Sequence, residues 1–86
     1  MRVRIPSPLR SYTDKQAVVD GRGSTVDEVL RDLDARYPGI RFRMVDEQNR
    51  VRRHMKIWVN DEPVRDLSVP VTDADEVTIM QALSGG

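Results

Sequence analysis

Residues 24–37 read Ser-Thr-Val-Asp-Glu-Val-Leu-Arg-Asp-Leu-Asp-Ala-Arg-Tyr and predict one amphipathic helix, around which the rest of the fold is arranged. Thr25 and Glu28 have the spacing of a capping box, in which the threonine hydroxyl accepts a hydrogen bond from the glutamate amide and the glutamate side chain reaches back. Apolar residues then recur at the spacing of one helical face, at Val26, Val29, Leu30, Leu33 and Tyr37. Pro38-Gly39 follows this stripe and predicts the end of the helix.

Two stretches before the helix have the composition of strands. In residues 2–6, Val3 and Ile5 share one face, and Pro6 ends the pattern because proline cannot donate to a ladder. Residues 16–20 predict a second strand. The polar residues between the two stretches predict a turn, so we expect a hairpin.

Two alternating stretches follow the helix, at residues 56–60 and 76–82. Their helix-facing positions are predicted to be Ile57, Val59, Val77 and Ile79, and their opposite face to carry Trp58, Thr78 and Met80. Turns are predicted at residues 60–63 and 73–75, with a short strand at residues 64–67 between them. Residues 40–55 are mostly charged and are interpreted as a connecting segment with room for one helical turn.

This order of elements predicts an α+β domain. A single amphipathic helix buries its stripe against one face of a mixed sheet, which gives two layers. If both ends of the chain share the core, the first and last strands cannot both lie at sheet edges. The β-grasp arrangement satisfies this, because its first and last strands lie parallel at the centre. We expect one domain over residues 1–86, with four to five strands on one main helix and residues 83–86 as a flexible Gly-Gly tail.

Composition excludes several classes of site. Lys plus Arg and Asp plus Glu both number 14, so the chain lacks the basic excess of a dedicated nucleic-acid binder. Cysteine is absent and His54 is the only histidine, which excludes disulfides, thiolate zinc sites and His-rich metal sites. No signal peptide or membrane span is predicted, and a cytoplasmic protein is the expectation.

The sequence contains no convincing pattern of catalytic residues. Asp73 and Asp75 are interpreted as turn formers rather than as an acid–base pair, and His54 as a surface histidine. Gly21-Arg-Gly23 lacks the lysine and the spacing of a phosphate loop. The basic run from Arg50 to Lys56 is interpreted as a solvated face, with contact to phosphate or an acidic partner as the alternative.

The end of the sequence is the remaining candidate site. Leu83-Ser-Gly-Gly86 follows the last predicted strand directly. Glycine has no side chain, so a Gly-Gly tail fits a narrow channel and can present its carboxylate to a distant active site. The alternative is a frayed terminus, since chain ends are commonly disordered.

The whole chain resembles the ubiquitin-like sulfur-carrier family, which includes the small subunit of molybdopterin synthase and the thiazole-biosynthesis carrier. The motifs that carry the resemblance are Val3–Pro6, Ser24–Leu30, Trp58–Glu62, Asp75–Ile79 and Gly85-Gly86. Within the family the chain looks closest to carriers that feed an actinobacterial cysteine synthase, through Ile5-Pro6, Leu9-Arg10, Tyr37, Gly39-Ile40 and Val59–Glu62 with Val64-Arg65. It departs from the family before the Gly-Gly, where Gln81, Leu83 and Ser84 stand in a region that often holds proline and a small apolar residue.

The resemblance implies a non-catalytic carrier whose working group is the carboxylate of Gly86, with Gly85 and Ser84 as its tail. An activating enzyme would adenylate this carboxylate with ATP, and a sulfur donor would displace AMP to leave a thiocarboxylate. The implied partners are an E1-like adenylyltransferase or sulfurtransferase, a cysteine-synthase-like acceptor and a metalloprotease that releases the product. No bound cofactor, metal, nucleic acid or membrane is implied.

Other functions stay open from the residues alone. The sulfur could serve molybdopterin or thiazole synthesis, Gly86 could form an isopeptide bond as a protein modifier, or the chain could be a plain interaction domain. For the partner-binding surface we expect Trp58, Met80 and Leu83, on the face of the sheet away from the helix. The alternative is that residues 40–55 fold over this face and bury it.

Overall fold

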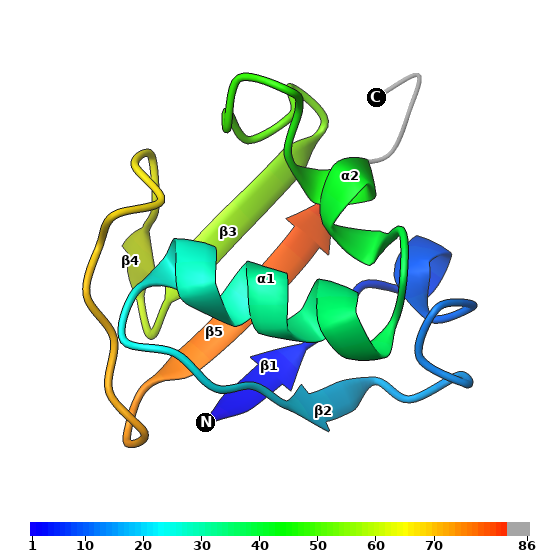
Figure 1. Ribbon diagram of the computed structural model, residues 1–86, viewed down its shortest axis with the longest axis horizontal. Coiled ribbons are helices and arrows are strands. Elements are labelled where there is room, and N and C mark those ends of the chain that lie inside the picture. The colour runs from blue at the N-terminus through cyan, green and yellow to red at the C-terminus, as the bar shows by residue number, and fades with distance from the viewer. Residues whose placement is uncertain (83–86) are drawn as a thin grey trace.

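The computed structural model describes residues 1–82 and has two layers, a mixed sheet and a layer of helices on one of its faces (Figure 1). The strands are β1 (Arg2–Arg4), β2 (Val18–Asp20), β3 (Met55–Val59), β4 (Glu62–Pro63) and β5 (Glu76–Gln81). They form one five-stranded sheet in the order β2-β1-β5-β3-β4. The helices are η1 (Ser7–Leu9), α1 (Val26–Arg36) and α2 (Ile40–Met44).

The first and last strands lie next to each other at the centre of the sheet. β1 pairs with β5 in parallel, with Val3 opposite Val77, whereas all other strand pairs are antiparallel. The hairpin of β1 and β2 is present as predicted, with Val3 opposite Val19. This is the β-grasp arrangement expected from the sequence, and it brings residue 82 out of the middle of the sheet.

The cap of α1 differs from the expected capping box in one contact. The amide of Glu28 donates to the Thr25 hydroxyl at 3.2 Å, as predicted. The Glu28 carboxylate reaches back to Ser24, one residue before the cap, and accepts from both its amide and its hydroxyl at 3.0 Å. The amides of Val26 and Asp27 already donate to the carbonyls of Val69 and Leu67. The backbone amides in the first turn of α1 are therefore hydrogen-bonded within the protein.

The helical stripe packs on one face of the sheet, as expected. Val26, Val29, Leu30 and Leu33 are fully buried, and Tyr37 is half-buried against the same core. The core also takes strand residues and Ile5, which follows β1 directly; the strand residues are Val3, Val19, Met55, Ile57, Val59, Val77 and Ile79.

Residues 40–55 do more than connect. Ile40 and Met44 of α2 and the following Val45 are fully buried in the main core, and α2 lies beside α1 (Figure 1). Residues 40–45 therefore close one end of the helix layer and do not cover the outer face of the sheet. The sequence prediction missed this because a five-residue helix is too short to show a repeating stripe.

The link after β3 is also tighter than predicted. Asn60 has a φ of 54° and forms a two-residue turn with Asp61, so β4 starts at Glu62. Such turns favour asparagine because it tolerates positive φ. The Val64 amide then donates to the Ile57 carbonyl at 2.8 Å, and Val64 and Leu67 are buried. The separate strand predicted at residues 64–67 is wrong.

Neither α1 nor α2, the α-helices within residues 1–82, is long and apolar enough to cross a membrane.

Candidate functional site

The candidate tail leaves the sheet at the end of β5. Gln81 pairs with Met55, and the Ala82 amide donates to the His54 carbonyl at 2.8 Å. The predicted site residues Leu83, Ser84, Gly85 and Gly86 lie outside the described residues. The described structure therefore shows where the tail starts. The turn before β3 lies on one side of this point, and the outer face of the sheet lies on the other.

Trp58 and Met80 lie on the predicted outer face, away from α1. Trp58 stands between Thr78 and Pro63, and Met80 stands opposite Lys56 on the neighbouring strand. Met80 is 50% exposed, whereas Trp58 is half-buried. The Trp58 indole N–H is shielded from solvent and has no hydrogen-bond acceptor in residues 1–82. The structure thus brings the two residues onto one face, in diagonal positions on adjacent strands.

The same face becomes charged toward the start of β5. Arg4 donates to the Glu76 carboxylate at 2.8 Å, and Arg2 lies 3.8 Å from it. The hydrogen bond from Arg4 holds the pKa of Glu76 below its ordinary value. The apolar part of the outer face is therefore at the end of β5 from which the tail leaves.

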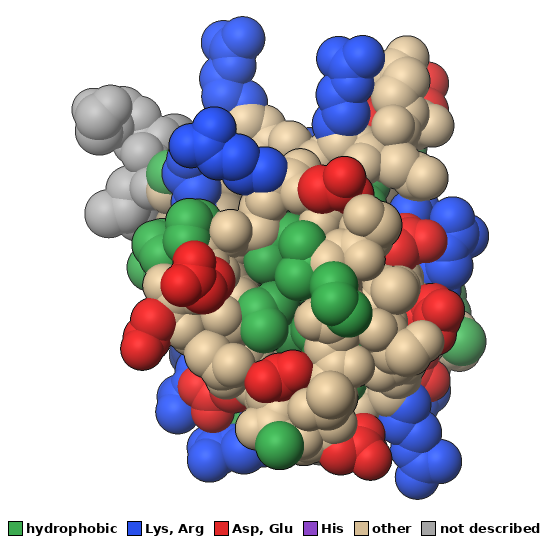
Figure 2. All heavy atoms as spheres, turned by 90° about the vertical axis from the view of Figure 1, so that its left-hand side faces the viewer, with side chains coloured by type: hydrophobic (Ala, Val, Ile, Leu, Met, Phe, Trp, Pro, Cys, Tyr) green, Lys and Arg blue, Asp and Glu red, His purple; other side chains and the backbone are tan. Residues whose placement is uncertain are grey.

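A hollow of about 440 Å³ reaches Trp58 from the β4 edge of the sheet. Its apolar lining includes Val51, Pro63 and Val64. Figure 2 shows hydrophobic side chains gathered on this side of the molecule, with charged groups around them. Part of the apolar surface around Trp58 thus extends past the edge of the sheet.

Asp73 and Asp75 lie in the turn before β5, as the sequence predicts. The Asp75 carboxylate accepts from the Asn60 side-chain amide at 2.9 Å and from the Thr72 amide at 2.8 Å. These bonds hold its pKa below the ordinary value, so it is an ionised turn-closing group. Asp73 is exposed in the same turn. Within residues 1–82 no group of three or more metal-ligating side chains comes together.

His54 is a surface histidine, as the sequence predicts, but its position at the start of the tail was not predicted. It is exposed, and its backbone carbonyl holds the start of the tail. Beside it are Phe42 and Arg43 of α2 and Arg52, which together line a hollow of about 200 Å³. Phe42 is 55% exposed, and its position between Arg41 and Arg43 is the only sequence signal that it faces solvent.

The family model described as the ThiS family matches residues 3–86. The chain belongs to the ThiS family. Among curated relatives, the sulfur carrier protein CysO of Mycobacterium tuberculosis and that of Mycobacterium bovis are 40% identical to it over 89 residues. Each alignment covers 98% of this chain and 96% of the relative. The resemblance to ubiquitin-like sulfur carriers is confirmed.

Solved structures similar to this chain have the same fold. CysO in the Amycolatopsis orientalis BexX/CysO complex matches with a TM-score of 0.91 and 39% identity, covering 99% of this chain and 98% of its own. Mycobacterium tuberculosis CysO matches with a TM-score of 0.89 and 39% identity, covering 95% and 98%. SAMP1 of Haloferax volcanii, at 23% identity and a TM-score of 0.78, covers 100% and 98% and shares the fold. The β-grasp prediction is confirmed.

Proposed function

We propose that this chain is a sulfur carrier for cysteine biosynthesis and that the carboxylate of Gly86 carries the sulfur. The observation that supports this most is the 40% identity, over nearly the whole chain, to relatives named sulfur carrier protein CysO. The geometry agrees with the proposal, because the end of β5 leads the chain out of the sheet beside an exposed apolar face.

The chemistry follows from the weakness of a carboxylate as an electrophile. A Gly86 carboxylate oxygen attacks the α-phosphorus of ATP, pyrophosphate leaves, and an acyl adenylate forms. A hydrosulfide donor then attacks the acyl carbon, and AMP leaves with the bonding electron pair. The product is a thiocarboxylate, which is ionised at neutral pH and nucleophilic through sulfur. The activating enzyme supplies the ATP site and the catalytic groups, so the chain itself acts as co-substrate.

The proposal includes three partner enzymes. An E1-like adenylyltransferase or sulfurtransferase loads the tail, a cysteine-synthase-like enzyme accepts the sulfur, and a metalloprotease releases the product. Trp58, Met80 and Leu83 are the residues we propose for partner contact, because an exposed methionine beside an aromatic ring is typical of surfaces that fit several partners. Loading of the tail consumes ATP. We propose that the chain works in the cytoplasm.

The test is the intact mass of the chain after incubation with its activating enzyme, ATP and a sulfide source. The expected result is a shift equal to one oxygen-to-sulfur exchange. A variant that lacks Gly86 should show no shift and should keep the thermal melting curve of the full chain. Sulfur gain by this truncated variant would refute the assignment of Gly86.

A second incubation separates sulfur transfer from protein modification. The loaded chain is offered to a cysteine synthase, and the expected result is loss of the sulfur mass from the chain with formation of cysteine. A stable adduct between Gly86 and a lysine side chain, without cysteine formation, would instead support a protein modifier.

A further inference from the structure

Four residues form one small surface at the point where the tail leaves the sheet. We call Phe42, Arg43, Arg52 and His54 the basic platform, since they line one shallow hollow. His54 is directly connected to the tail, because its carbonyl accepts the Ala82 amide at 2.8 Å. Any enzyme that draws residues 83–86 into its active site therefore approaches the basic platform.

The basic platform is held in shape within the protein. The Arg52 guanidinium lies 4.5 Å from the centre of the Phe42 ring, and its Nε donates to the Phe42 carbonyl at 2.7 Å. The Arg52 amide donates to the Met44 carbonyl, which ties the turn before β3 to α2. These contacts already orient Arg52. The Arg52 side chain would therefore lose little conformational entropy when its two terminal nitrogens bind a ligand.

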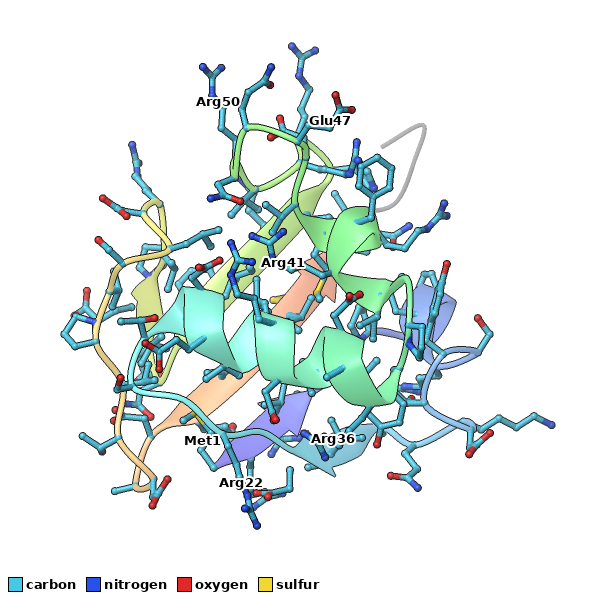
Figure 3. All side chains as sticks on the ribbon, in the orientation of Figure 1. Met1, Arg22, Arg36, Arg41, Glu47 and Arg50 are labelled. Carbon is cyan, nitrogen blue, oxygen red and sulfur yellow. The ribbon has the colours of Figure 1, made fainter. Side chains whose placement is uncertain are left out.

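Arg43 and Arg52 of the basic platform form no ion pair within residues 1–82. The nearby carboxylate is that of Asp46, whose pKa is held below its ordinary value first by the hydrogen bond from the Arg50 amide and further by the charges of Arg50 and Arg52. Ion pairs in residues 1–82 engage the arginines of β1 and α1 and also Arg22 and Arg41, but not Arg43 or Arg52. Arg41 is different, since it points back toward α1 (Figure 3) and donates to Asp27 and Asn49. Within the same described residues, Arg53 and Lys56 beside the platform also lack ion pairs.

The segment that contains the basic platform has an excess of basic residues, whereas the whole chain has none. Residues 41–56 hold six Lys or Arg and two Asp or Glu, whereas the totals for the chain are 14 and 14. Phe42 and Met80 are the large hydrophobic residues exposed within residues 1–82, and they flank the start of the tail on α2 and on β5. An exposed aromatic ring beside unpaired arginines is the usual composition of an interface centre.

We propose that the basic platform docks an acidic surface segment of the activating enzyme, next to the channel that receives the tail. This inference rests on the proposed function and adds the chemistry by which that enzyme recognises the carrier. The complementary group is a pair of Asp or Glu side chains, because a guanidinium fork binds carboxylate in a bidentate manner. An acidic patch around the channel would steer the basic end of the carrier, and with it the tail, toward the active site.

The experiment measures ATP–pyrophosphate exchange by the purified adenylating enzyme of the source organism, with the full chain as the varied substrate. The variant Arg43→Glu/Arg52→Glu should raise the KM for the chain about tenfold at low salt and leave kcat nearly unchanged, since steering charges act on encounter. The increase should shrink as salt is raised, because salt screens exposed charges.

Three further variants make this result specific. Arg43→Glu alone removes no side-chain contact described in residues 1–82 and should raise KM in the same direction even if the double variant folds poorly. Arg43→Lys keeps the charge but loses the guanidinium fork, so its KM should lie between those of the wild type and Arg43→Glu. Lys15→Glu, which reverses an exposed charge far along the chain from the platform, is the matched control and should retain the wild-type KM.

The outcomes separate the two proposals. An unchanged KM for both folded Arg→Glu variants, with normal exchange by the wild-type chain, would overturn the docking surface and leave the carrier function intact. Absence of exchange with the wild-type chain would overturn both. If the variants lost binding to a short single-stranded RNA while their KM stayed at the wild-type value, the basic platform would be a nucleic-acid site instead.

Discussion

The amide of Ala82 donates a hydrogen bond to the carbonyl of His54, 28 residues earlier in the chain, at 2.8 Å. This bond ends the ladder between β5 and β3 and anchors the start of the tail beside α2. The outer-face residues Trp58 and Met80 and the basic platform thus lie on two sides of the same exit point. The consequences for stability and binding can be tested with single substitutions.

Leu30→Ala should lower the free energy of unfolding by about 2–5 kcal/mol, since Leu30 is fully buried under the sheet and its loss leaves a cavity. That is a large part of the roughly 5–15 kcal/mol available to a domain. The measurement is urea denaturation. Phe42→Ala is the control, because it removes a large side chain from the surface and should cost less than about 1 kcal/mol. Equal losses in the two variants would contradict the packing of α1.

Gly23→Ala should destabilise the protein more than Gly39→Ala. Gly23 has a φ of +155°, and an added Cβ would lie 2.7 Å from the Glu28 Cβ and 2.8 Å from the backbone nitrogen of Val29. Gly39 has a φ of +95° but leaves 3.4 Å to the Tyr12 ring. We expect a loss of about 1 kcal/mol at Gly39 from backbone strain and roughly 2 kcal/mol or more at Gly23, where the helix start must shift as well. Thermal melts of both variants decide this, and a reversed order would be inconsistent with the geometry at Gly23.

Trp58→Ala should weaken binding to the activating enzyme and lower the free energy of unfolding by about 1–2 kcal/mol, because the indole is only half-buried. Trp58→Phe is the matched variant. It keeps an aromatic ring and removes the N–H that has no acceptor in residues 1–82, so its stability should stay within about 1 kcal/mol of wild type. Calorimetric binding and denaturation are measured on both. A severe loss of folding in Trp58→Ala with unchanged affinity would assign Trp58 to the core.

Acid should destabilise the protein through Asp27. Burial raises the pKa of this carboxyl, but hydrogen bonds from Arg31 and Arg41 outweigh that effect and hold the pKa below its ordinary 3.8. The unfolded chain therefore takes up a proton at higher pH than the folded chain. The stabilisation is present above the ordinary pKa and is lost as pH falls through the lower, folded value.

Denaturation between pH 7 and pH 3 measures this effect. Asp27→Asn should be less stable than wild type at pH 7 and should lose less stability on acidification. It will keep some pH dependence, because Asp75 and Glu76 also have lowered pKa values. Asp61→Asn changes an exposed carboxyl without an ion pair or side-chain hydrogen bond in residues 1–82 and should follow the wild-type curve. A wild-type pH slope in Asp27→Asn would remove Asp27 as a cause.

Local patterns in the sequence are enough to predict the two layers of the fold and the face to which each strand residue points. The stripe of residues 26–37 and the alternation around Ile57 and Ile79 are local periodic patterns, and burial of such patterns admits few arrangements. The outward positions of Trp58 and Met80 were predictable for the same reason. The Gly-Gly tail stays a prediction, because Leu83, Ser84, Gly85 and Gly86 lie outside the described residues.

The residues that surround the exit of the tail come from distant parts of the chain, and packing in three dimensions brings them together. Phe42, Arg52 and His54 come together because Ile40, Met44 and Val45 bury themselves beside α1 and draw the segment toward the end of β5. The five residues of α2 carry no period long enough to predict this. The placement follows from filling the open end of the core, which is a property of the whole packed chain and is absent from any short stretch of it.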